Sequence, residues 1–182
     1  MNKLEIQTDR LMLRLIEWTD VEVIHRLHSL PETDEFNTLG IPENLQETYE
    51  VITPWIEANN VAEIRNYTFA IQHKKKGEFI GLFGLRLGPK KYNRAEVWYK
   101  LHLDYWNKGY ATEALKAVLK YGFDVLKLHR IEAGCAVDNI GSAKVMEKVG
   151  MQKEGRKRKI LPLQSGWSDS FEYAIVEGDV RN

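Results

Sequence analysis

The chain alternates between stretches with a two-residue hydrophobic period and stretches with helical spacing. Residues 10–16 alternate apolar and polar side chains, as a half-buried strand does, and residues 18–30 place apolar side chains at helical intervals. A second helix is predicted over residues 42–59, although Pro54 lies inside it and should bend it or split it in two. The first third of the chain therefore predicts a strand followed by helices.

The rest of the chain continues this alternation. In order, it predicts a strand hairpin (66–87), a strand (94–103), a long amphipathic helix from residue 111, a buried strand (129–137), a short helix (138–150) and a final hairpin. Gly122 falls within the buried stripe of the long helix, where close packing explains a glycine better than helix termination. Together these elements predict one α/β (α+β) domain over residues 1–182, with a mostly antiparallel sheet and one strand–helix–strand crossover.

Composition narrows the classes of function. Lysine plus arginine and aspartate plus glutamate number 26 each, so no net charge draws the chain to nucleic acid or to an anionic membrane. The N-terminus lacks the apolar core of a signal peptide and no long apolar run occurs, so we expect a soluble, cytoplasmic protein. The single cysteine, Cys135, excludes an internal disulfide and lies in an apolar stretch that predicts a buried core residue. The histidines lack carboxylates at ligand spacing, so we expect no metal.

The stretch DYWNKGYATEALKAVLKYG (104–122) leads from a predicted strand into the long helix through a short loop of small and polar residues. The backbone N–H groups at the start of this helix would point outward at the positive end of the helix dipole, which suits a phosphate or pyrophosphate. A glycine before a helix is also often only a turn. The loop is not a P-loop, because no Gly-Lys-Ser/Thr closes it, and it is not a Gly-x-Gly-x-x-Gly fingerprint.

The segment YWNKGYATEAL resembles the pyrophosphate loop of the GCN5-related N-acetyltransferase (GNAT) superfamily, specifically its RimJ/RimL-type branch, which acetylates ribosomal-protein N-termini. Trp106 takes the first place of the pattern Gln/Arg-x-x-Gly-x-Gly/Ala, and Gly109 and Ala111 match the others. Further similar stretches are TDRLMLR (8–14), EFIGLFGL (78–85), AEVWYKL (95–101), VDNIGSAKVMEKVGMQKEG (137–155) and DSFEYAIV (169–176). The resemblance covers nearly the whole chain, but Trp98 and Asn107 stand where this branch often has glycine.

The resemblance implies a GNAT fold with about seven strands and about four helices, splayed between strands 4 and 5, where the pantetheine arm of acetyl-CoA lies. Strand 4 corresponds to residues 95–103, so the main chain of three residues should bind the cosubstrate and polarise the thioester carbonyl: Leu101, His102 and Leu103. The loop residues expected to hold the pyrophosphate are Asn107, Lys108, Gly109, Tyr110, Ala111 and Thr112. Asn139 should contact the pantetheine amide or the acetyl group, or else cap its helix. Acetyl-CoA is expected as a cosubstrate, with no metal.

Two residues align with catalytic positions of the superfamily. Glu96 aligns with the carboxylate that some members use as a base, directly or through water; the alternative is an ordinary strand carboxylate paired with Arg94 or Lys100. Ser142, three residues after Asn139, is the candidate proton donor to the leaving thiolate, or it simply completes the first helical turn. His102 ranks below Glu96 as a base.

The acceptor is the least determined part of the reaction. The resemblance implies direct acetyl transfer to a primary amine, with a protein or peptide N-terminal α-amine expected. A small amine such as an amino sugar, a polyamine or an antibiotic is the alternative, and a non-catalytic acyl-CoA-binding sensor is the alternative from another class. Trp98 would narrow the acceptor side or pack on the sheet. The acidic residues of segment 31–50 would favour a cationic acceptor or form a solvated face. We expect a monomer or a homodimer.

Overall fold

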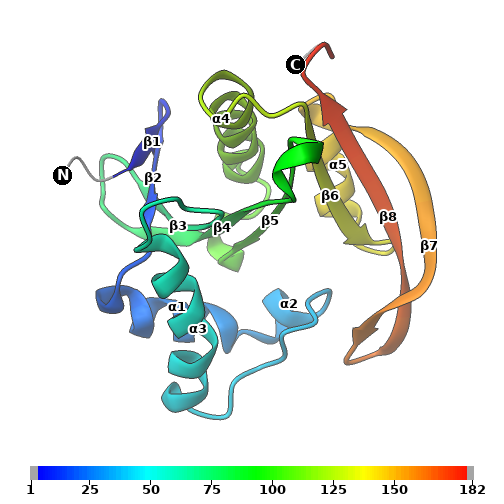
Figure 1. Ribbon diagram of the computed structural model, residues 1–182. Coiled ribbons are helices and arrows are strands. Elements are labelled where there is room, and N and C mark those ends of the chain that lie inside the picture. Colours follow the sequence, from blue (N-terminus) through cyan, green and yellow to red (C-terminus); the bar gives the residue numbers. More distant parts are fainter. Residues whose placement is uncertain (1–3, 180–182) are drawn as a thin grey trace.

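The computed structural model describes residues 4–179, which form one eight-stranded sheet with helices on both faces (Figure 1). The strands are β1 (Glu5–Gln7), β2 (Leu11–Leu15), β3 (Asn66–His73), β4 (Phe79–Leu87), β5 (Arg94–Leu101), β6 (Arg130–Ala136), β7 (Gln152–Leu163) and β8 (Gly166–Val176). Their order in the sheet is β1-β2-β3-β4-β5-β6-β8-β7. Neighbouring strands are antiparallel except for β5 and β6, which are parallel.

Five α-helices and three short 3-10 helices connect these strands within residues 4–179. The α-helices are α1 (Val21–His28), α2 (Pro31–Asp34), α3 (Leu45–Asn59), α4 (Tyr110–Asp124) and α5 (Ile140–Lys148). The 3-10 helices are η1 (Trp18–Asp20), η2 (Lys90–Tyr92) and η3 (Leu103–Tyr105). None of the described helices is long and apolar enough to cross a membrane. The predicted α/β fold and mostly antiparallel sheet are confirmed, and the short β1 and α2 account for the elements beyond the predicted number.

The two faces of the sheet are covered by different helices. One core lies under α4 and α5 and contains Ala95, Val97 and Leu101 of β5. The other lies under α1 and α3, on the opposite side of the sheet in Figure 1, and contains Leu82 of β4. Because successive side chains of a strand point to opposite faces, Lys100, which is opposite Leu82 in the β4–β5 register, lies on the α1/α3 face. The alternation of β5 therefore assigns Glu96, Trp98 and Lys100 to one face of the sheet.

Helix α3 corrects one prediction. It runs as one helix from Leu45 to Asn59 with Pro54 inside it, so of the two predicted effects of Pro54, a bend or a split, the split is wrong. The helix begins three residues later than predicted, where the Asn44 side chain accepts a hydrogen bond from the Glu47 N–H (3.1 Å). Burial of Ile52 and Ile56 against the sheet holds the helix together on both sides of the proline.

The packing of α4 against β6 confirms the interpretation of Gly122. A Cβ atom at Gly122 would lie 2.6 Å from Cδ1 of Ile131 and 3.3 Å from Cδ1 of Leu128. Both neighbours are buried core residues, so there is little room for them to move aside. The absence of a side chain at this position lets α4 approach the sheet closely.

We predict that Gly122→Val lowers the free energy of unfolding by about 1–3 kcal/mol, because its side chain would overpack the α4–β6 contact. Urea denaturation measures this change. Gly155→Val is the matched control, since a Cβ at Gly155 meets nothing within 4 Å and valine favours strands. Equal stabilities of the two variants would contradict the packing role of Gly122.

Candidate functional site

The sheet opens between β5 and β6. These parallel strands pair only at Arg94↔Arg130, Ala95↔Ile131 and Glu96↔Glu132. Beyond Glu96, β5 stays paired with β4 as far as Leu101, while β6 stays paired with β8 as far as Ala136. The two strands therefore separate after Glu96 and Glu132, which is the predicted splay between the fourth and fifth strands, now numbered β5 and β6.

The main chain of β5 presents hydrogen-bonding groups to this gap. The His102 N–H donates to the carbonyl of Ile80 in β4 (2.9 Å). Because alternate residues of a strand direct their N–H and C=O groups to opposite sides, those of Val97, Tyr99 and Leu101 face the gap. Of the three predicted main-chain ligands, Leu101 thus faces the gap, whereas the His102 N–H is already used and Leu103 begins η3.

The end of β5 is tied to the predicted pyrophosphate loop. The indole N–H of Trp106 donates to the carbonyl of Leu101 (2.8 Å). Asn107 and Gly109 both have left-handed backbones, with φ of 57° and 78°. Asparagine is among the few non-glycine residues that adopt this conformation readily, which explains how Asn107 occupies a place where glycine is frequent. Two left-handed residues turn the chain sharply from η3 into α4.

Helix α4 begins at Tyr110, with Gly109 as its N-cap. The first N–H groups of a helix have no partner within the helix, and they carry the positive end of its dipole. The Glu113 N–H makes the first helical bond, to the carbonyl of Gly109 (3.0 Å). The structure therefore brings the predicted segment 107–112 together at one positive helix end, next to the open end of the gap.

Residues of the turn between β1 and β2 hold this loop in place. The Glu113 carboxylate accepts hydrogen bonds from the Thr8 hydroxyl (2.5 Å), the Arg10 N–H (2.9 Å) and Arg10 Nε (2.6 Å). Arg10 Nη1 also donates to the carbonyl of Lys108 (3.0 Å), and its guanidinium lies 4.3 Å from the ring centroid of Tyr110. Sequence reasoning identified the segment 8–14 only as a signature and missed this contact with the loop, because the partners lie about a hundred residues apart.

The contacts with Thr8 and Arg10 also shift the pKa of Glu113. Desolvation acts to raise the pKa of Glu113, but the hydrogen bonds from Thr8 and Arg10 and the charge of Arg10 outweigh it and lower the pKa below its ordinary value. Glu113 is therefore ionised at neutral pH. A carboxylate in the first turn of α4 also interacts favourably with the helix dipole.

Glu96 stands at the last position where β5 pairs with β6, on the α1/α3 face of the sheet. Its carboxylate forms an ion pair with Arg86 of β4, which lies directly opposite it, and half of its side chain is exposed. Neither expected partner is correct: Arg94 pairs with Glu132 (3.6 Å), and Lys100 makes no ion pair with Glu96. Glu96 is thus solvent-accessible at the start of the gap.

Asn139 and Ser142 lie together at the start of α5. The Asn139 side-chain oxygen accepts a hydrogen bond from the Ser142 N–H (3.0 Å), so the helix-cap interpretation is confirmed for that oxygen. Ser142 Oγ lies 2.8 Å from the hydroxyl of Tyr99 on β5. Burial raises the pKa of the Tyr99 phenol, so Tyr99 keeps its proton. Sequence reasoning missed Tyr99, although its position on the same strand face as Val97 was predictable from the alternation.

The α1/α3 face of β5 holds a group of aromatic and charged side chains. The rings of Trp98 and Trp55 of α3 are 5.4 Å apart, and the ring of His28 lies edge-on to Trp55 at 6.1 Å. Lys100 and Asp34 are buried on this side, and burial lowers the pKa of Lys100 to about 8 although the charge of Asp34 opposes the shift. Trp98 packs over Gly84 of β4 yet remains partly exposed.

Two further observations concern residues outside the gap. Cys135 is buried, as predicted, and burial raises its pKa to about 11, so its thiol is not a nucleophile at neutral pH. Within residues 4–179, no group of three or more His, Cys, Asp and Glu side chains is placed to hold a metal ion.

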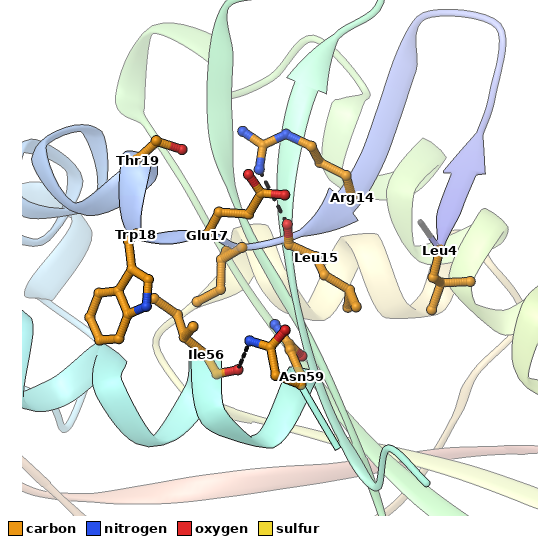
Figure 2. Close-up of a pocket in the computed structure, with 10 residues that line it drawn as sticks. Leu4, Arg14, Leu15, Glu17, Trp18, Thr19, Ile56 and Asn59 are labelled. Carbon is orange, nitrogen blue, oxygen red and sulfur yellow. Dashed lines mark hydrogen bonds between the residues drawn. The ribbon is translucent and has the colours of Figure 1, made fainter. Parts of the chain in front are cut away.

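A pocket of about 440 Å³ lies elsewhere, between the end of β2 and helix α3 (Figure 2). It is lined by Leu4, Arg14, Leu15, Ile16, Glu17, Trp18, Thr19, Ile56, Asn59 and Asn60. Arg14 is occupied by a two-fold hydrogen bond to Asp20 (2.8 and 2.7 Å), and β3 and β4 separate β2 from β5. This pocket therefore does not belong to the gap.

Comparison with known proteins is consistent with this geometry. A family model described as "Acetyltransferase (GNAT) domain" matches residues 10–152. Bacillus subtilis YnaD and YoaA, each described as an uncharacterized N-acetyltransferase, are 33% and 32% identical to the chain over 177 and 172 residues. These alignments cover 96% and 94% of the chain and 98% and 96% of the relatives. A GNAT-family acetyltransferase structure from Bacillus anthracis has a TM-score of 0.82 at 31% identity, covering 96% of this chain and 99% of that one.

Two further similar proteins carry more specific names. Vibrio cholerae spermidine N(1)-acetyltransferase is 28% identical over 173 residues, which cover 95% of this chain and 96% of that protein. Mycobacterium smegmatis RimJ, solved in complex with CoA-disulfide, has a TM-score of 0.81 at 22% identity, covering 91% of this chain and 81% of that one. The second likeness concerns the fold alone. The comparisons therefore do not select an acceptor.

We predict that Gly109→Val weakens the binding of coenzyme A by about tenfold or more, because it distorts a left-handed N-cap and crowds Arg10 Nη2, 3.4 Å from the added Cβ. Isothermal titration calorimetry measures the affinity. Gly77→Val is the matched control, since Gly77 has a similar φ of 71° but lies in the β3–β4 turn with nothing near a Cβ. Unchanged affinity in the Gly109 variant would place the pyrophosphate elsewhere.

We predict that His28 makes folding stability depend on pH. Burial, followed by the charges of Lys100 and His25, lowers its pKa to about 3 from 6.5. Between these values the unfolded chain binds a proton that the folded chain does not. The free energy of unfolding therefore falls as the pH falls below about 6.5, by up to about 1.4 kcal/mol per pH unit. Urea midpoints at about pH 7 and pH 5 should differ less for His28→Leu than for wild type; equal differences would contradict this role.

Proposed function

The chain belongs to the GNAT acetyltransferase family, and on that premise we propose that it transfers an acetyl group from acetyl-CoA directly to a primary amine in a ternary complex. The observation that carries this proposal is the separation of β5 from β6 after Glu96, with main-chain groups of β5 facing the gap and the start of α4 at its open end. An extended thioester arm needs such main-chain partners, and a pyrophosphate needs such a helix end.

The segment 107–112 is proposed to hold the pyrophosphate of acetyl-CoA through its backbone N–H groups. Arg10 supports this role because it fixes the Lys108 carbonyl and adds a positive charge next to Gly109. Leu101 is the predicted strand residue best placed for the pantetheine arm, and the Asn139 amide N–H groups lie at the start of α5, beside Tyr99 and Ser142. The main-chain groups among these contacts have positions that are set by secondary structure, and Arg10 and Asn139 add side-chain groups to them.

The proposed reaction forms a bond between the amine nitrogen and the acyl carbon and breaks the bond between that carbon and sulfur. The nitrogen must lose a proton, and Glu96 is the proposed acceptor of that proton, directly or through water. This role is supported by the position of Glu96 at the start of the gap, where half of its side chain is exposed. The ion pair with Arg86 fixes the place of this carboxylate on the strand.

The sulfur gains a proton as it leaves, and Ser142 is the proposed donor. The Tyr99 hydroxyl, 2.8 Å from Ser142 Oγ, supports this role because a protonated phenol can donate to the serine oxygen while the serine proton is directed elsewhere. A thiolate is a fair leaving group, so Ser142 is expected to contribute less than Glu96.

Two classes of acceptor are proposed. The resemblance to the RimJ/RimL branch favours a protein or peptide N-terminal α-amine. A small amine is favoured by one specific observation, namely that the α1/α3 face of β5 carries the paired indoles of Trp55 and Trp98 and the buried charges of Lys100 and Asp34. A panel of peptides and small amines, with thiol release as the readout, separates these classes. Binding of acetyl-CoA without acetylation of any amine would support a non-catalytic sensor instead.

We predict that Glu96→Gln lowers kcat at neutral pH by about 100-fold and leaves the affinity for coenzyme A unchanged, because it removes a proton acceptor and keeps the side-chain shape. Thiol release against pH measures the effect. Glu132→Gln is the matched control, since Glu132 faces Glu96 in the β5–β6 register and is paired with Arg130. If both variants keep the wild-type rate at every pH, Glu96 is not the base.

A further inference from the structure

Two buried charged atoms on the α1/α3 face have no hydrogen-bond partner within residues 4–179. They are Nζ of Lys100 and Oδ1 of Asp34. The residues are 6% and 3% exposed, so both atoms are shielded from bulk solvent. The other acidic residues of segment 31–50 are exposed or half-buried, so Asp34 is the exception in what is otherwise a solvated acidic face.

The burial of two charged atoms without hydrogen bonds raises the free energy of the folded protein unless a bound group supplies the missing partners. Burying an ammonium and a carboxylate is favourable only when each finds a close opposite charge or hydrogen bonds. Lys100 and Asp34 attract each other, yet no hydrogen bond joins them. His28, which shares this face, is neutral at physiological pH and adds no compensating charge. A ligand with both a negative group and an N–H donor would satisfy both atoms at once.

The position of these atoms connects them to the proposed reaction. Lys100 lies on β5 beyond the last β5–β6 pair, in the part of the strand whose main chain borders the gap. It shares a strand face with Trp98, which is 37% exposed, and with Glu96, whose side chain is 50% exposed. This face of β5 therefore reaches solvent within a few residues of Lys100. Asp34 ends α2, on the same side of the sheet as α1 and α3 (Figure 1). The pair therefore lies on the same face of the sheet as the proposed base.

We propose that Lys100 and Asp34 select an acceptor that carries a carboxylate next to its amine, that is, a free amino acid or a similar small amino-carboxylate. The Lys100 ammonium donates to the acceptor carboxylate, and Asp34 Oδ1 accepts from the N–H groups of the amine. This inference rests on the proposed acetyl transfer and develops its small-amine candidate. A polyamine would bring a further cation close to Lys100, and a peptide N-terminus has an amide where the carboxylate is required.

The test compares free L-amino acids with their C-terminal amides as acceptors, with spermidine and a short peptide alongside. Each amide keeps the amine and the side chain and loses only the negative charge. Its amine is less basic and thus more fully deprotonated, so intrinsic reactivity favours the amide and a preference for the free acid has to come from recognition. We expect kcat/KM for the best amino acid to exceed that of its amide by about 10- to 100-fold.

Variants locate the source of this preference. Lys100→Met should reduce kcat/KM for the amino acid to that for the amide and leave the amide value and coenzyme A affinity unchanged. Asp34→Asn should instead raise KM for both acceptors. Lys116→Met, at an exposed position of α4, is the matched control and should keep the wild-type preference.

Other outcomes would overturn the inference. If amines are acetylated but the amide, the peptide or spermidine is preferred, acetyl transfer stands and the recognition of a carboxylate is wrong. The same conclusion follows if Lys100→Met lowers kcat/KM equally for the amino acid and for its amide. If no amine is acetylated while acetyl-CoA binds, the proposed function itself fails.

Discussion

The candidate site depends on one constraint: β5 remains paired with β4 along its length while it leaves β6 after three residue pairs. Main-chain groups that have lost a strand partner need another one, so the second half of β5 is prepared for an extended ligand. Strand β6 is not weakened by the separation, because it pairs with β8 from Arg130 to Ala136. The opening is therefore held by complete ladders on either side, and it needs no flexible element.

Helix α4 makes this opening useful for a charged cosubstrate. The crossover from β5 to β6 places the helix N-terminus at the open end of the gap, and two left-handed residues aim the chain into it. Thr8 and Arg10, in the turn between β1 and β2, then fix Glu113 and Lys108 through four hydrogen bonds. The positive helix end is thus held against the sheet, so little conformational entropy would be lost on binding an anion there.

The two faces of β5 have different electrostatics. On the α4/α5 face, Tyr99 and Ser142 form a closed neutral hydrogen bond next to the apolar core. On the α1/α3 face, Glu96 is paired with Arg86, whereas Nζ of Lys100 and Oδ1 of Asp34 are buried and form no hydrogen bond within residues 4–179. In the proposed reaction, the first face serves the departing thiol and the second serves the recognition of the incoming amine. One strand can separate these tasks because its side chains alternate.

The sequence by itself determined the order of the helices and strands apart from β1, α2 and the 3-10 helices, as well as the fold class, the loop before α4 and the buried place of Gly122. Each follows from periodicity, glycine placement or local capping, which are properties of neighbouring residues. Only the tertiary structure decided that Pro54 stays inside one helix, that Glu96 pairs with Arg86, that Thr8 and Arg10 hold Glu113, and that Asp34 is buried near Lys100. These outcomes depend on contacts between different helices and strands, and the free energy of each depends on burial and charge that arise only when these elements pack together.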